Sequence, residues 1–110
     1  MTAFAVGLDT LQRAALDFAN ALRAEDGREP VPALVMGTPY SCAGCPIAAT
    51  ANMGTRRDYP QWEVGAVAVK ISASGKPTRG RAQVPVPPKV PEFMAAFDSG
   101  MYPDLIAGQA

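Results

Sequence analysis

The sequence predicts a small α+β domain in which helices pack on one face of an antiparallel sheet. Apolar residues recur at helical spacing between residues 8 and 22 and again between 90 and 97, whereas they alternate with polar residues between 78 and 86. The chain has 110 residues, of which 48% are hydrophobic and 18% charged. This composition is typical of a globular protein, and the length suits one core, so we expect residues 1–110 to form a single domain.

The first helix is predicted from residue 8 to about residue 25. Asp9 and Gln12 have the spacing of a capping box, and Asp26-Gly27 supplies a stop. Residues 3–6 are compatible with a longer helix. The apolar stripe predicts core packing for positions 8, 11, 15, 18 and 22, and solvent exposure for Arg13, Asp17, Asn20 and Arg23 on the other side.

A second, short helix is predicted after the cysteines. Residues 33–36 follow two prolines and are compatible with either a short strand or a helix. Pro46 is well placed as the first helical residue, and Gly54 ends a helix that runs to about Met53. Cys45 then lies at or near the N-cap and Cys42 in the preceding loop, with four side chains expected to face inward: Ile47, Ala48, Ala51 and Met53.

An antiparallel hairpin is predicted from residues 62–71 and 78–86, with room for a third short strand. Trp62 and Val64 have the opposite parity to the valines at 67 and 69, so we expect a β-bulge near Gly65. Pro85 cannot donate a ladder hydrogen bond, which predicts a sheet edge or the end of pairing there.

A C-terminal helix is predicted from the spacing of Val90, Phe93 and Phe97, and Gly100 ends it. Residues 101–106 are then expected to fold back over the core.

The two cysteines form the motif Cys42-Ala-Gly-Cys45, and the chain contains no histidine. Catalytic arrangements that need imidazole are therefore excluded within the chain, as are zinc sites with histidine ligands. Cys42 and Cys45 supply half of a four-thiolate metal site, which a homodimer could complete. Thiol–disulfide chemistry is an alternative, although the βαβ pattern of thioredoxin-like proteins is missing. Two thiols that simply pack at a loop–helix junction are the simplest interpretation.

Positive charge is concentrated in the middle of a chain whose net charge is zero. Residues 36–86 carry six basic and two acidic side chains, and aromatic residues lie near some of them. This pattern allows a nucleic-acid or ribosome interface, although the strong basic excess of such modules is absent. A solvated strand face protected from edge aggregation explains the arginines equally. The candidate surface residues are Arg56, Arg57, Tyr59, Trp62, Arg79 and Arg81.

No apolar run approaches the roughly 20 residues of a membrane helix, and no secretion signal is visible. We therefore expect a cytoplasmic protein without membrane association, with reduced cysteines. The glycines match neither a P-loop nor a dinucleotide fingerprint, and no pair of carboxylates stands out. Neither a cofactor nor enzymatic activity is expected.

The motif Cys45-Pro-Ile-Ala at a helix start and the final Phe93-x-x-x-Phe97-Asp-x-Gly helix resemble small uncharacterised proteins of actinobacteriophages and GC-rich actinobacteria. The resemblance covers roughly the C-terminal two thirds of the chain and brings no assigned activity, catalytic residue or ligand. It implies a compact accessory protein that binds a host or phage macromolecule.

The leading functional hypothesis is thus a small, non-enzymatic binding protein that acts by protein–protein interaction, with a host or phage protein as partner. A nucleic-acid-associated module that uses the basic central segment is the first alternative. A thiol-redox or metal-binding protein that uses Cys42 and Cys45 is the second.

Overall fold

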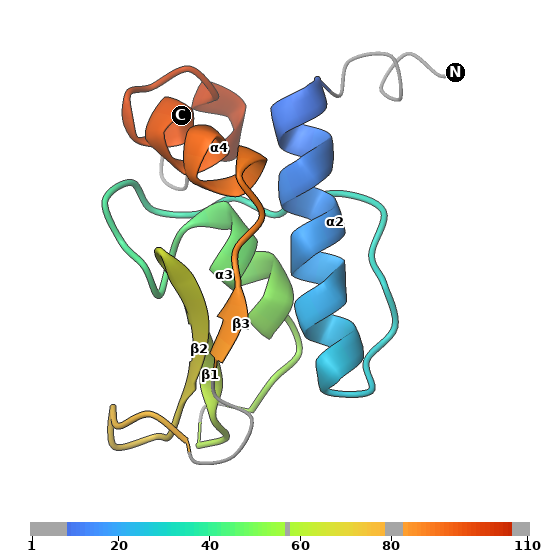
Figure 1. Ribbon diagram of the computed structural model, residues 1–110, viewed down its shortest axis with the longest axis vertical. Coiled ribbons are helices and arrows are strands. Elements are labelled where there is room, and N and C mark those ends of the chain that lie inside the picture. The colour runs from blue at the N-terminus through green and yellow to red at the C-terminus, as the bar shows by residue number, and fades with distance from the viewer. Residues whose placement is uncertain (1–8, 57, 79–82, 107–110) are drawn as a thin grey trace.

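The computed structural model describes residues 9–56, 58–78 and 83–106 (Figure 1). These residues form an α+β domain, as predicted, with helices against one face of an antiparallel sheet of order β1-β2-β3. The α3 helix lies between α2 and the sheet, and α4 packs against α2. The elements are α2 (Thr10–Glu25), α3 (Pro46–Asn52), β1 (Gln61–Val64), β2 (Val67–Ile71), β3 (Gln83–Pro85), α4 (Lys89–Asp98) and the 3-10 turn η1 (Pro103–Leu105).

The α2 helix begins with the predicted capping box. The backbone N–H of Gln12 donates to Asp9 Oδ1 at 2.7 Å, and the N–H of Asp9 donates to Gln12 Oε1 at 3.5 Å. Asp26 is the C-cap, and Gly27 follows with a φ of 71°. The apolar stripe is buried as expected at Ala15, Phe18 and Leu22, while residues 3–6 lie outside the described part of the chain.

The prediction that Arg23 faces solvent is wrong, because its side chain is only 7% exposed. Its Nε donates to the carbonyl of Glu29 at 2.7 Å, and its Nη1 donates to the carbonyls of Thr50 and Met53 at 3.2 and 3.0 Å. The last carbonyls of a helix have no partner within that helix. Arg23 satisfies those at the end of α3, a role that the helical periodicity of α2 cannot reveal.

Asn20, on the same side of α2, is also not simply solvated. It exchanges two hydrogen bonds with the backbone of Val31, at 3.0 and 2.9 Å. The polar side of α2 therefore anchors the segment that leads to the cysteines. Residues 33–36 in that segment form neither a strand nor a helix.

The α3 helix matches its predicted bounds, with Pro46 first and Cys45 as N-cap. Ile47, Ala48 and Ala51 are fully buried as expected. Met53 is 40% exposed, contrary to the prediction, because the chain leaves the helix at this C-cap residue.

The predicted continuous strand 62–71 with a bulge is wrong, because the chain reverses at Gly65–Ala66. The N–H of Gly65 donates to the carbonyl of Val67 at 3.1 Å, and β1 pairs with β2 in an antiparallel hairpin. The change of parity noticed in the sequence is thus the signature of a turn. In this register Trp62 pairs with Lys70 and Val64 with Ala68, and all four side chains are buried on the inner face.

Part of the second predicted strand, 78–86, is present in the structure as β3. Val84 of β3 pairs with Ala68 of β2, and β3 ends at Pro85 on the sheet edge, as the missing proline N–H requires. Residues 79–82 of the predicted strand lie outside the described residues.

A buried ion pair lies on the inner face of the sheet. Lys70 Nζ is 2.6 Å from Asp26 Oδ2, and the two side chains are only 3% and 8% exposed. The indole N–H of Trp62 donates to the same oxygen at 3.2 Å, and the ammonium group lies 5.1 Å from the Trp62 ring centre and 5.5 Å from that of Tyr59. The end of α2 is therefore joined to the central strand.

The C-terminal segment folds back over the core as predicted. The α4 helix is followed by Gly100 with a φ of 90°, and the ring of Tyr102 stacks on Phe93 at 5.0 Å. The Tyr102 hydroxyl donates to Asp9 Oδ2 at 2.9 Å, and burial together with this carboxylate raises the pKa of Tyr102 to about 12. No helix in the described part of the chain is long and apolar enough to cross a membrane.

The substitution Lys70→Met should lower the free energy of unfolding by about 3–5 kcal/mol, because it removes the buried ammonium group that lies 2.6 Å from the Asp26 carboxylate. Urea denaturation measures the change. The double variant Asp26→Asn/Lys70→Met should lose less than the sum of the two single variants.

The matched control is Arg56→Ala, which breaks the exposed pair between Arg56 and Asp58, whose side chains are 80% and 68% exposed. Its cost should stay below about 1 kcal/mol. Equal losses of unfolding free energy in Lys70→Met and Arg56→Ala would show that the buried pair stabilises the fold no more than the exposed pair does.

Candidate functional site

The segment 37–45, here called the cysteine loop, is closed by its own hydrogen bonds. The N–H of Thr38 donates to the carbonyl of Gly44 at 2.6 Å, and the N–H of Gly44 donates to Ser41 Oγ at 2.9 Å. Such side-chain bonds to nearby backbone are what serine and threonine supply in turns. The loop therefore has a defined shape of its own.

Two further hydrogen bonds attach the cysteine loop to the rest of the fold. The N–H of Val64, at the end of β1, donates to the carbonyl of Cys42 at 2.9 Å. The N–H of Tyr40 donates to Asp98 Oδ1, at the end of α4, at 2.8 Å. The loop thus spans the space between the hairpin and the C-terminal helix.

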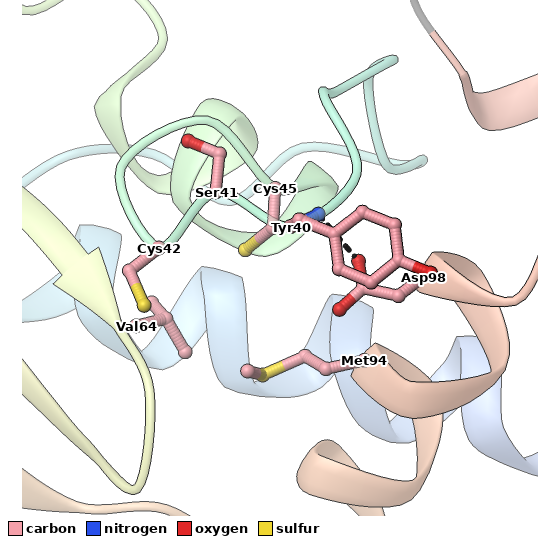
Figure 2. A pocket seen from close by; sticks show the side chains of 7 residues that line it. All are labelled: Tyr40, Ser41, Cys42, Cys45, Val64, Met94 and Asp98. Atoms are coloured by element: carbon pink, nitrogen blue, oxygen red, sulfur yellow. Dashed lines mark hydrogen bonds between the residues drawn. The ribbon is translucent and has the colours of Figure 1, made fainter.

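An open pocket of about 250 Å³ lies in that space (Figure 2). The cysteine loop forms one side, the end of β1 another, and α4 the third. The lining residues are Tyr40, Ser41, Cys42, Cys45, Val64, Met94 and Asp98.

The two cysteines differ in environment, although both are free thiols. Cys42 is exposed, whereas Cys45 is 4% exposed and caps α3, its sulfur accepting from the N–H of Ala48 at 3.5 Å. Burial raises the pKa of the Cys45 thiol, and the backbone N–H groups of Ala48 and Ile47 only partly offset this rise. Cys45 is therefore a protonated thiol at neutral pH, and Cys42 is the accessible one.

The residues that could hold a zinc-type metal remain those named from the sequence, Cys42 and Cys45. Within residues 9–56, 58–78 and 83–106, no group of three or more His, Cys, Asp or Glu side chains is arranged to hold a metal ion. The structure brings Asp98 to the pocket, but its Oδ1 accepts from Tyr40. A four-thiolate site shared by two copies of the chain stays a prediction.

Tyr40 has an unusual backbone. Its φ is 58°, the one positive φ of a non-glycine residue in the described chain. The left-handed region costs such a residue about 1–2 kcal/mol, so the surrounding structure must impose it. The hydrogen bond from its N–H to Asp98 is one of the contacts that hold this backbone, at a residue that is 82% exposed.

Three apolar side chains, here called the loop–tail surface, are the most exposed large hydrophobic groups of the described residues. Tyr40 is 82% exposed, Met101 70% and Met36 56%. The N–H of Gly37 donates to the carbonyl of Leu105 at 2.8 Å, which together with the Tyr40–Asp98 bond brings their two segments side by side. Long-range pairing thus joins the two segments that carry these side chains.

The predicted nucleic-acid surface is not assembled by the described residues. Trp62 is 1% exposed, so its predicted surface position is wrong: cross-strand pairing turns it inward. Arg56 is exposed but paired with Asp58 at 2.9 Å, and Tyr59 is 52% exposed. Arg57, Arg79 and Arg81 lie outside the described part of the chain.

Sequence reasoning missed Tyr40, Met94 and Asp98 as site residues. Met94 carries no signal apart from its helical spacing, and Asp98 looks like an ordinary helix-end residue. Only the meeting of the cysteine loop with α4 gives them a role.

Compared with known proteins, the chain matches no protein-family model, no curated protein and no solved structure at a significant level. The site is therefore interpreted from its own geometry.

Gly37→Ala should destabilise the domain by about 3 kcal/mol, because a Cβ there would overlap backbone atoms of Gly44, Cys45 and Pro46. Thermal or urea unfolding measures the loss. The control Gly65→Ala places its Cβ 3.6 Å from Cys42 Sγ, an ordinary contact, and should cost clearly less. Equal losses would mean that the close packing of the loop on α3 is unimportant.

Iodoacetamide should alkylate Cys42 rapidly and Cys45 only after unfolding, because Cys42 is exposed while Cys45 is buried with a raised pKa. Mass spectrometry after peptide cleavage locates the label. The Cys42→Ser variant should stay unlabelled until denaturant is added. Rapid labelling of that variant in the native state would contradict the assigned burial.

Proposed function

We propose that the chain is a small, non-enzymatic binding protein that contacts a protein partner through the loop–tail surface. The observation that carries the proposal is the exposure of Met36, Tyr40 and Met101 on two segments that are joined by hydrogen bonds. Scattered single hydrophobic residues are normal on a surface, whereas a group of them is typical of interaction sites.

The state of Tyr40 supports this choice of surface. Tyrosine is enriched among the residues that dominate binding energies, because it offers a large contact area with few rotatable bonds. Here the backbone is already held in its left-handed conformation by Asp98, so less ordering of the loop is needed when a partner binds. The pocket beside Tyr40 can receive an apolar side chain of the partner.

The charge around the loop–tail surface predicts the charge of the partner segment that binds it. Residues 30–45 contain no charged side chain, and residues 90–106 contain Glu92, Asp98 and Asp104 but no lysine or arginine. A partner segment with an apolar side chain flanked by basic residues complements this surface. If the chain is phage-encoded, as the resemblance noted above implies, the partner belongs to a host or phage complex.

A nucleic-acid role is the weaker proposal. Of the two aromatic residues of its candidate surface, Tyr59 is exposed but Trp62 is buried. The exposed Arg56 is already paired with Asp58, which reduces its attraction for phosphate groups.

The test is capture of the partner from nuclease-treated lysate of the source cells, followed by titration with the purified partner. Tyr40→Ser should raise the Kd by about 30-fold, the equivalent of the 2 kcal/mol that defines a binding hot spot. Met36→Ser and Met101→Ser should weaken binding in the same direction.

Tyr59→Ser and Met53→Ser are matched controls, because these side chains are 52% and 40% exposed but lie outside the loop–tail surface. Both should retain wild-type affinity. Recovery of no stoichiometric protein, or equal weakening by Tyr59→Ser and Tyr40→Ser, would refute the proposal.

A further inference from the structure

The pocket brings together sulfur atoms from two segments that are far apart in the chain. Cys42 and Cys45 come from the cysteine loop, and Met94 comes from α4. Figure 2 shows the three sulfur atoms facing the same opening from different sides. The CxxC motif alone supplies two sulfur ligands, and the fold adds the third.

Three sulfur donors favour one kind of ligand. Thiolate and thioether sulfur are soft donors that select Cu(I), whereas a structural zinc site needs four nitrogen, oxygen or thiolate ligands. The described residues contain no group of three or more His, Cys, Asp or Glu side chains arranged for a metal. The pocket thus suits a soft monovalent ion better than zinc.

The backbone near Cys45 also suits a metal-bound thiolate. Its sulfur accepts from the N–H of Ala48 at 3.5 Å at the start of α3, so a negative sulfur would keep a donor. Cys42 is exposed, which leaves the pocket accessible to an ion from solution. Asp98 at the pocket wall offers hard carboxylate oxygens, one of which accepts from Tyr40, so the soft donors of the pocket are its sulfur atoms.

The geometry points to a Cu(I) site formed by Cys42 Sγ, Cys45 Sγ and Met94 Sδ. Binding forms two copper–thiolate bonds and one copper–thioether bond, and it releases the two thiol protons to solvent. Copper stays in the Cu(I) state, so the step needs no oxidant or reductant. This site uses the pocket that Tyr40 of the loop–tail surface also lines, but its test needs no protein partner.

The test uses the full, reduced chain without oxygen and Cu(I) supplied as its acetonitrile complex, in competition with bicinchoninate. We expect one Cu(I) per chain, with three sulfur neighbours by X-ray absorption at the copper edge. Met94→Leu conserves volume, so it should leave the fold intact, weaken binding by at least about 10-fold and leave two sulfur neighbours. Met53→Leu is the control outside the pocket and should bind like the wild type.

Cys45→Ser separates metal binding from folding, because serine is a good N-cap and should keep α3 intact. This variant and Cys42→Ser should each lose Cu(I) binding by more than about 100-fold, above the effect of outer-shell substitutions. Three outcomes overturn the assignment: no Cu(I) retained against bicinchoninate, equal affinity in Met94→Leu, or tighter binding of Zn(II) than of Cu(I). One copper per two chains in sedimentation would also overturn it, since it would mean a shared four-thiolate site.

Discussion

The buried contact between Asp26 and Lys70 constrains the arrangement of the layers. One carboxylate oxygen receives both the Lys70 ammonium and the Trp62 indole N–H, so the C-cap of α2 and the first two strands meet at a single point. A charge taken from water is tolerated only where its partner and its hydrogen bonds are in place. Other registers of β1 on β2 would separate Lys70 from Trp62, so this pair also helps to specify the hairpin register.

The candidate site depends in part, and indirectly, on that arrangement. With the hairpin fixed, the N–H of Val64 is placed to hold the carbonyl of Cys42. The α4 helix, which packs on α2, holds Tyr40 through Asp98. The pocket exists because the cysteine loop bridges these two supports without filling the space between them. Its side chains come from three separate stretches of the chain, and no one of them forms the site alone.

Local signals predicted the elements well where the cause is local. The capping box at Asp9, Pro46 at the start of α3 and Gly100 after α4 each act within one turn of helix, and each is found where expected. The failures have long-range causes. Arg23 and Trp62 are buried by partners far away in the sequence, and the parity change at Gly65 is resolved as a turn only by the pairing of β1 with β2.

The site was predictable only as far as the cysteines. Pro46 indicated that a helix starts there with Cys45 at or near its N-cap and Cys42 in the preceding loop, which the structure confirms. Met94 lies about fifty positions later and became a neighbour of the thiols only through folding. Tyr40 has a backbone conformation that its residue type does not favour, so no pattern in the sequence predicts it.

The short α3 helix has a consequence of its own. It has seven residues, a length at which an isolated helix is unstable in water, so its ends must be held from outside. A sulfur atom holds the first turn and the guanidinium of Arg23 holds the last carbonyls, about 10 Å away at the helical rise of 1.5 Å per residue. The helix therefore depends on side chains from two different segments, and the loss of either one leaves unpartnered backbone groups at that end of α3.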